Sequence, residues 1–303
     1  MDPRTSPCFT GCATALITPF QDGKVDFYAF EKILQQQIDA DVDALVVTGT
    51  TGESSTLTDR EKRDLYTTAV RSVRASGKKI PVIAGTGSNN TARAVELSRM
   101  AESVGCDGLL LVTPYYNKAS QTGLAAHFTA VADAVSLPVI LYHVPSRTGC
   151  TMTVNTCQKL SEHPRIVGLK DATGQIGYTA RVSAACGASL PLYSGNDDTV
   201  TPVLALGGLG VISVVSNLLP EVMVKLCRAW REGDLPTAAA LQSYILPLCD
   251  ALFCEVNPIP IKCAMSLCGL CRNEVRLPLA PCDEALTEKL RHLLHGYKAE
   301  LPQ

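Results

Sequence analysis

Residues 166–173, Ile166-Val167-Gly168-Leu169-Lys170-Asp171-Ala172-Thr173, join a short apolar run to a polar end. The β-branched residues predict a buried strand, and Gly174 predicts the turn that follows it. Similar runs occupy residues 12–20, 44–49, 80–85, 108–114, 138–145, 191–195 and 210–215. Most are continuously apolar rather than alternating, which is typical of parallel strands covered by helices on both faces.

The segments between these runs carry helix signals. Thr58 and Glu61 form a capping box, and Asn90 precedes an amphipathic stretch over residues 92–104. Eight strands that each precede a helix predict a (β/α)8 TIM barrel. An open doubly wound sheet is the alternative, but the glycine-rich residues 85–90 lack the third glycine of its fingerprint and come too late in the chain.

Only helical patterns follow residue 215, at residues 221–232, 235–253, 260–268 and 283–296. We expect the first to be the last barrel helix and the others to form a small C-terminal helical appendage. The predicted division is a barrel over residues 1–232 and a helical domain over residues 233–303.

Composition limits the class of protein. The 303 residues are 46% hydrophobic but only 5% aromatic, so the core must be aliphatic, as in an α/β protein. A net charge of -2 argues against nucleic acid as a partner. No stretch is long enough to span a membrane and the N-terminus lacks a signal-peptide pattern, so we expect a cytoplasmic protein.

The 13 cysteines are odd in number and scattered, unlike the even sets of secreted disulfide frameworks. Cys268 and Cys271 form a C-x-x-C pattern without a second pair, and we interpret them as incidental thiols at a helix end. His292 and His295 could share a helix face, but no third ligand accompanies them, so we expect no metal site.

Chemistry in a TIM barrel lies at the C-terminal ends of the strands, and Lys170 ends the sixth of them. Apolar surroundings would lower the pKa of its ammonium and favour the neutral amine, which forms Schiff bases with carbonyl compounds. Taken alone, a lysine at a strand end more often pairs with a carboxylate or extends to solvent.

The other predicted strand ends supply partners for that amine. Thr50 and Thr51 stand between two glycines, whose backbone N–H groups form a nest for a carboxylate. Tyr116 and Tyr142 offer phenols that can pass protons, and Arg147 offers a bidentate contact to a second carboxylate. Taken alone, each of these residues could have a purely structural role. Together they predict a class I aldolase-type site for α-keto acids.

These motifs resemble the dihydrodipicolinate synthase family of pyruvate-dependent lyases over nearly the whole chain. The matching segments are residues 11–20, 49–54, 81–87, 113–117, 141–149, 168–174, 208–214 and 257–260. The resemblance implies condensation of pyruvate with L-aspartate 4-semialdehyde in diaminopimelate and lysine biosynthesis, with no separate cofactor. It also implies a homo-oligomer, either a dimer or a dimer of dimers.

The resemblance also implies a role for each matched residue. Lys170 would form the imine with pyruvate, and Thr50 and Thr51 would hold the pyruvate carboxylate. Gly195 and Ile212 would supply backbone groups near the imine.

A proton relay completes the implied site. It would run through Tyr142, Thr51 and Tyr116, with Tyr116 reaching in from the neighbouring subunit, and Arg147 would bind the carboxylate of aspartate semialdehyde. A sialic acid or sugar acid aldolase is the alternative enzyme, but the Thr50-Thr51 pair and Arg147 favour the synthase. A catalytically silent barrel would be expected to lack Lys170 or a relay tyrosine, and none is missing.

The chain departs from the family pattern at two places. His143 stands where the family usually has Asn, and strand alternation should point it away from the relay. The feedback site for lysine is matched only at Ser54, Asn89 and Tyr115 and departs at Asp59, Lys62 and Arg93. Because Lys62 and Arg93 would repel the ammonium groups of lysine, we expect weak or absent lysine inhibition.

Overall fold

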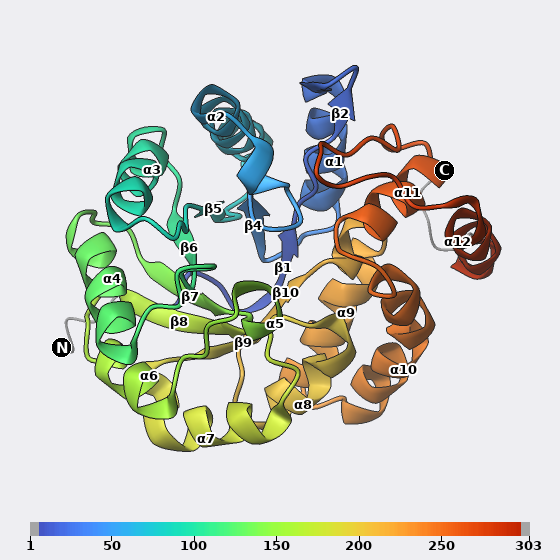
Figure 1. The fold of residues 1–303 in the computed structure, drawn as a ribbon. Helices are drawn as coiled ribbons and strands as arrows, with labels where there is room; N and C mark the ends of the chain where they lie inside the picture. Colours follow the sequence, from blue (N-terminus) through green and yellow to red (C-terminus); the bar gives the residue numbers. More distant parts are fainter. Residues whose placement is uncertain (1–5, 298–303) are drawn as a thin grey trace.

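The computed structural model describes residues 6–297, in which eight parallel strands close into a barrel (Figure 1). The strands are β1 (Gly11–Ala15), β4 (Ala44–Val47), β5 (Val82–Gly85), β6 (Gly108–Val112), β7 (Val139–His143), β8 (Ile166–Asp171), β9 (Leu192–Ser194) and β10 (Gly210–Ser213). Each strand pairs with its neighbours in chain order, and β1 closes the ring by pairing with both β4 and β10. The predicted TIM barrel is therefore confirmed.

Helices surround the barrel, and the last three lie at the right of Figure 1, where α10 packs against α9. The helices are α1 (Phe27–Asp39), α2 (Asp59–Ser76), α3 (Thr91–Ser103), α4 (Gln121–Asp133), α5 (Pro145–Thr148), α6 (Val154–Ser161), α7 (Ile176–Cys186), α8 (Val200–Ala205), α9 (Pro220–Arg231), α10 (Leu235–Leu252), α11 (Ile259–Leu267) and α12 (Glu284–Tyr297). The capping box at Thr58 and Glu61 starts α2 as predicted.

The first predicted strand was too long. It ends at Ala15, and Phe20 belongs instead to a two-stranded hairpin of β2 (Phe20–Gln21) and β3 (Lys24–Val25). The chain leaves the barrel because its polar groups bond elsewhere: the Ile17 N–H donates to the side chain of Asn217, and the Thr18 hydroxyl donates to the carbonyl of Gly52. Apolar residues there face helices, which is why the pattern resembled a strand.

Two hydrophobic layers hold the fold. Alternating residues of β7 separate them: Ile140 and Tyr142 face the barrel interior, whereas Val139 and Leu141 pack against the helices. The outer layer continues without a break into α10, α11 and α12. Burial of such aliphatic side chains stabilises the fold by about 1.5–3 kcal/mol each. The division at residue 232 stays a prediction.

All 13 cysteines are free thiols, and Cys268 directly follows α11 at the helix end where it was predicted. Within residues 6–297, no three or more His, Cys, Asp or Glu side chains are grouped so that they could hold a metal ion. Among the helices of that same range, none combines the length and apolar character that a membrane crossing requires.

Candidate active site

Lys170 lies at the C-terminal end of β8, with Tyr142 of β7 and Tyr193 of β9 as its neighbours in register. It is only 6% exposed, and burial lowers the pKa of its ammonium to about 8. The carboxyl group of Asp197 opposes this shift, and the guanidinium of Arg147 adds to it. A much larger share of this amine is therefore neutral near pH 7 than in an ordinary lysine.

Tyr142 provides a proton donor beside that amine. The Lys170 Nζ lies 4.3 Å from the centre of the Tyr142 ring, and the phenol is hydrogen-bonded to the side chain of Thr50. Burial raises the pKa of the phenol, so Tyr142 is protonated at neutral pH. An amine of lowered pKa and a protonated phenol thus share one end of the barrel.

A cavity of about 150 Å³ opens in front of these two groups. The predicted site residues that line it are Lys170, Tyr142, Thr50, Thr51, Arg147 and Gly195. Ile212 lies beneath it in the barrel-interior layer. The structure therefore brings together residues that are far apart in the sequence and places cationic and hydroxyl groups around one amine.

Gly195 allows the end of β9 to approach the lysine strand closely. A Cβ atom at this position would lie 2.6 Å from the Cβ of Ala172 and 2.9 Å from the carbonyl oxygen of Asp171. The Gly195 N–H donates to that same carbonyl at 2.7 Å. A side chain at position 195 would thus push β9 away from the end of β8, which carries Lys170.

The loop after β4 folds into a tight turn that contains Thr50 and Thr51. Its turn is closed by the N–H of Gly52 bonding to the Gly49 carbonyl and the N–H of Glu53 bonding to the Thr50 carbonyl, both at 3.1 Å. The amides of Thr50 and Thr51 take no part in these bonds. The Thr51 hydroxyl accepts a hydrogen bond of 2.9 Å from Nδ2 of Asn257, which leaves its own hydrogen available to donate.

Asn257 and two further side chains were not given roles from the sequence. The carbonyl of Asn257 accepts a hydrogen bond of 3.1 Å from Arg147, so this residue ties Thr51 and Arg147 together. Next to this turn, Glu53 and Lys262 form a buried ion pair. The signals in the sequence were the family-like segments 49–54, which contains Glu53, and 257–260, which contains Asn257; Lys262 lies in neither, and a matching segment does not indicate its contacts.

Tyr116 is separate from this cavity within one chain. It is 89% exposed and adopts a φ of 73°, an uncommon conformation for a tyrosine. In the described chain Tyr142 bonds to Thr50, and Tyr116 points its side chain to the outside. The relay through Tyr142, Thr51 and Tyr116 stays a prediction, because it requires a second subunit.

His143 points away from the relay, as strand alternation predicted. Its Nε2 accepts a hydrogen bond of 3.0 Å from the Met152 N–H, and its ring lies 5.1 Å from that of Tyr178 on α7. Burial lowers the pKa of His143 to about 4, so the ring is neutral at physiological pH.

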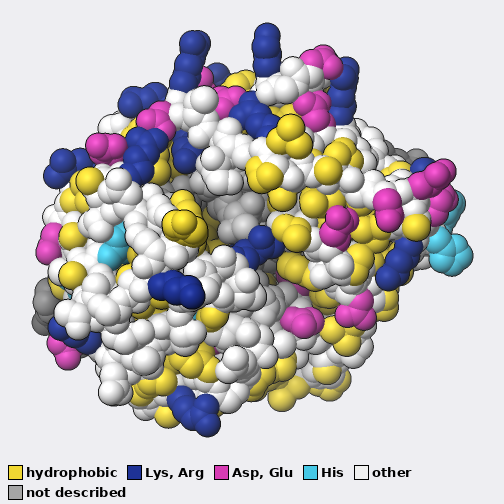
Figure 2. Space-filling model, viewed as in Figure 1, with side chains coloured by type: hydrophobic (Ala, Val, Ile, Leu, Met, Phe, Trp, Pro, Cys, Tyr) yellow, Lys and Arg dark blue, Asp and Glu magenta, His cyan; other side chains and the backbone are white. Residues whose placement is uncertain are grey.

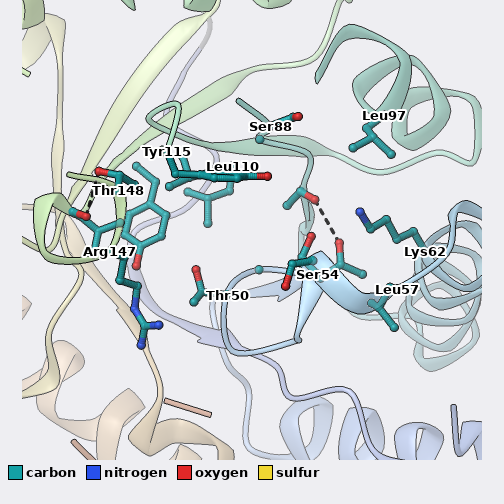
Figure 3. Close-up of a pocket in the computed structure, with 18 of the residues that line it drawn as sticks. Thr50, Ser54, Leu57, Lys62, Ser88, Leu97, Leu110, Tyr115, Arg147 and Thr148 are labelled. Atoms are coloured by element: carbon teal, nitrogen blue, oxygen red, sulfur yellow. Dashed lines mark hydrogen bonds between the residues drawn. The ribbon is translucent and has the colours of Figure 1, made fainter. Parts of the chain in front are cut away.

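A second, larger hollow of about 490 Å³ lies on the other side of Tyr142 and Thr50 (Figure 3). Ser54 and Tyr115, two of the residues matched to the regulatory site, line it together with Lys62 and Arg93. Asn89 donates to the Tyr115 carbonyl at 3.2 Å. These residues, separated in the sequence, are thus neighbours in the fold.

Comparison with known proteins agrees with this geometry. A sequence model of the Dihydrodipicolinate synthetase family matches residues 8–296. A 4-hydroxy-tetrahydrodipicolinate synthase of Clostridium novyi (strain NT) is 45% identical over 289 residues, which are 95% of this chain and 97% of that protein.

Two solved structures share the fold over most of both chains. A monomeric dihydrodipicolinate synthase variant has a TM-score of 0.92 at 39% identity and covers 95% of this chain and 96% of its own. The chloride-inhibited dihydrodipicolinate synthase of Acinetobacter baumannii, complexed with pyruvate, has a TM-score of 0.91 at 42% identity and covers 94% and 98%.

Proposed function

This chain belongs to the dihydrodipicolinate synthetase family, and we propose that its strand-end cavity condenses pyruvate with L-aspartate 4-semialdehyde through an imine on Lys170. The activity is that of a 4-hydroxy-tetrahydrodipicolinate synthase, a class I aldolase-type lyase of diaminopimelate and lysine biosynthesis. The observation that carries the assignment of the site is the buried Lys170 amine, whose pKa of about 8 suits a nucleophile, beside the Tyr142 phenol.

The first half of the reaction takes place on the Lys170 amine. The neutral amine adds to the carbonyl carbon of pyruvate, and water leaves to form the imine after Tyr142 supplies the proton that the departing hydroxyl needs. Thr50 and Thr51 hold the pyruvate carboxylate with backbone N–H groups and a hydroxyl. Loss of a proton from the methyl carbon then gives the enamine, which is the carbon nucleophile.

The second half joins the two substrates. The enamine carbon attacks the aldehyde carbon of aspartate semialdehyde, whose carboxylate is held by Arg147, and the aldehyde oxygen takes up a proton from the relay. The amine of the substrate then attacks the imine carbon, closes the ring and displaces Lys170. The imine supplies the electron sink, so the proposal includes no separate cofactor.

The proposal extends to assembly and location. A second copy of the chain would cover the exposed Tyr116 and bring its phenol to the neighbouring relay, in a dimer or a dimer of dimers. A cytoplasmic location is supported by the 13 free thiols, since cysteines stay reduced in that compartment.

Trapping the imine tests the central step. The protein is mixed with pyruvate, reduced with borohydride and digested, and the adduct is mapped by mass spectrometry. We expect the added mass on Lys170, and its absence there would overturn the proposal. Turnover with aspartate semialdehyde but not with N-acetylneuraminate would then separate the synthase from a sugar acid aldolase.

A further inference from the structure

Two thiols lie against each other between the last two helices. The Sγ atoms of Cys263 on α11 and of Cys282, in the loop before α12, each lie 3.6 Å from the same atom, Oγ1 of Thr287. The two thiols are also within hydrogen-bonding reach of each other. Cys263 and Cys282 are therefore direct neighbours, although they belong to different segments of the chain.

Thr287 fixes the positions of both sulfur atoms. Its hydroxyl donates its hydrogen to the Asp283 carbonyl at 2.7 Å, so its oxygen faces both thiols as an acceptor. The surrounding contact is a helix interface, because α11 packs against α12. α12 lies at the outer edge of the molecule (Figure 1), and Figure 2 shows charged and histidine side chains along that edge. The pair is thus held in place close to the molecular surface.

The two thiols differ in their access to solvent. Cys263 is fully buried, and burial raises the pKa of its thiol to about 11, so this thiol is protonated at neutral pH. Cys282 is partly exposed. An oxidant in solution therefore reaches Cys282 first and finds Cys263 directly behind it. An accessible thiol next to a second thiol is the arrangement of redox-active cysteine pairs.

We propose that Cys263 and Cys282 form a thiol–disulfide site that a small disulfide oxidises, which joins α11 to the loop before α12. The Cys282 thiolate attacks one sulfur of the small disulfide, releases one small thiol and keeps the other as a mixed disulfide. Cys263 then loses its proton, and its thiolate attacks the Cys282 sulfur and releases the second small thiol. Two protein thiols are oxidised, and the small disulfide takes up two electrons and two protons.

The new bond would fasten the helix that supports the loop after β4. Lys262 precedes Cys263 on α11, and its ammonium pairs with the carboxylate of Glu53 next to that loop. The bond also closes residues 263–282 into a ring, which reduces the freedom of the unfolded chain. Oxidation should therefore stabilise the C-terminal helices against heat. This site is additional to the proposed reaction and does not depend on it.

Mapping the thiols after oxidation tests the site directly. Whole wild-type enzyme is incubated with oxidised glutathione, the remaining thiols are blocked with iodoacetamide, and the digested peptides are identified by mass spectrometry. We expect two peptides joined through Cys263 and Cys282. The exposed Cys254 is the internal control: its Sγ lies 3.2 Å from the Ala251 carbonyl, which cannot displace a bound glutathione, so Cys254 should keep it as a mixed disulfide.

Cys282→Ser is the matched variant. It should leave Cys263 reduced, because the exposed thiol that meets the oxidant is gone, while Cys254 should react as in wild type. Oxidation should raise the Tm of wild type by about 5 °C above that of enzyme reduced with dithiothreitol, and it should leave the Tm of the variant unchanged.

The mapping on wild type needs no variant, so it decides the proposal even if Cys282→Ser folds poorly. Glutathione that stays on Cys282, a Cys282 thiol that does not react, or links between other cysteines only would each overturn the proposal. An equal rise in the Tm of wild type and variant would do the same for the stabilising role of the bond.

Discussion

The ammonium of Lys262 lies 2.6 Å from Oε1 of Glu53, and both side chains are almost fully buried, at 0% and 1% exposure. The other carboxylate oxygen of Glu53 accepts the N–H of Arg276 at 2.9 Å, and the Lys262 ammonium also lies 4.0 Å from the centre of the Phe20 ring. Because Glu53 directly follows the loop that carries Thr50 and Thr51, this ion pair ties the C-terminal helices to the carboxylate-binding loop.

Removing one partner of this pair should therefore affect both stability and substrate binding. Lys262→Met leaves the Glu53 carboxylate buried without its cation, and we expect a loss of about 3–5 kcal/mol in the free energy of unfolding, measured with urea. The KM for pyruvate should rise as the loop loosens. The double variant Lys262→Met with Glu53→Gln should recover much of the lost stability. If the single variant Lys262→Met were as stable as wild type, the proposed role of the ion pair would be wrong.

The pH dependence of imine formation should follow the Lys170 amine. Only the neutral amine attacks pyruvate, so the rate of borohydride trapping with pyruvate alone should rise with pH, with a midpoint at about 8. Arg147 lowers the pKa of Lys170, so Arg147→Gln should move this midpoint to higher pH. The variant should also raise the KM for aspartate semialdehyde by about tenfold or more, because a bidentate carboxylate contact is lost.

Arg147→Lys is the matched control for this experiment. It keeps the positive charge, so the midpoint of trapping should stay near that of wild type, while the KM for aspartate semialdehyde should still rise. A midpoint that Arg147→Gln leaves unchanged would show that the guanidinium does not act on the lysine.

The barrel could be predicted from the sequence because each strand is buried on both faces and therefore continuously apolar. Where burial had another cause, the prediction was wrong. Leu16, Ile17 and Phe20 are buried because they pack against helices, and the predicted strand was extended through them. The residues around the cavity could be predicted as a set, since strand ends of a barrel meet at one face.

Contacts between distant segments were not predictable in this way. Asn257, which lies between α10 and α11, and Lys262 of α11 reach the loop after β4 across more than two hundred positions of sequence. No periodicity or spacing links such partners.

Replacing His143 should change acid stability rather than catalysis. The folded-state pKa of about 4 lies below the ordinary value of 6.5, so the unfolded chain binds a proton that the folded chain does not between these pH values. Folding stability therefore rises with pH across this range. His143→Asn should lose less stability on acidification than wild type, and its pH–rate profile above pH 6.5 should match that of wild type. A shifted profile would mean that His143 acts on Tyr142.

L-Lysine should inhibit this enzyme weakly or not at all. Lys62 and Arg93 line the pocket in which Ser54 and Tyr115 match the regulatory residues, and the positive charge of Lys62 repels an ammonium group. Steady-state turnover is measured across a titration with lysine. Half-inhibition at sub-millimolar lysine would contradict this expectation. In Lys62→Met the repulsion is removed, so any inhibition should be stronger than in wild type.

Tyr116 should complete the site of the neighbouring subunit rather than its own. Tyr116→Phe and Lys170→Ala are each expected to be nearly inactive. The two variants are unfolded together and refolded as an equal mixture, so that half of the dimers contain one chain of each. One of the two sites in such a dimer then has both Lys170 and Tyr116. About a quarter of wild-type turnover should therefore return. Mixing Lys170→Ala with Tyr142→Phe is the control: both residues belong to the same chain's site, so no activity should return. Equal recovery in the two mixtures, or none in either, would place Tyr116 outside the partner's relay.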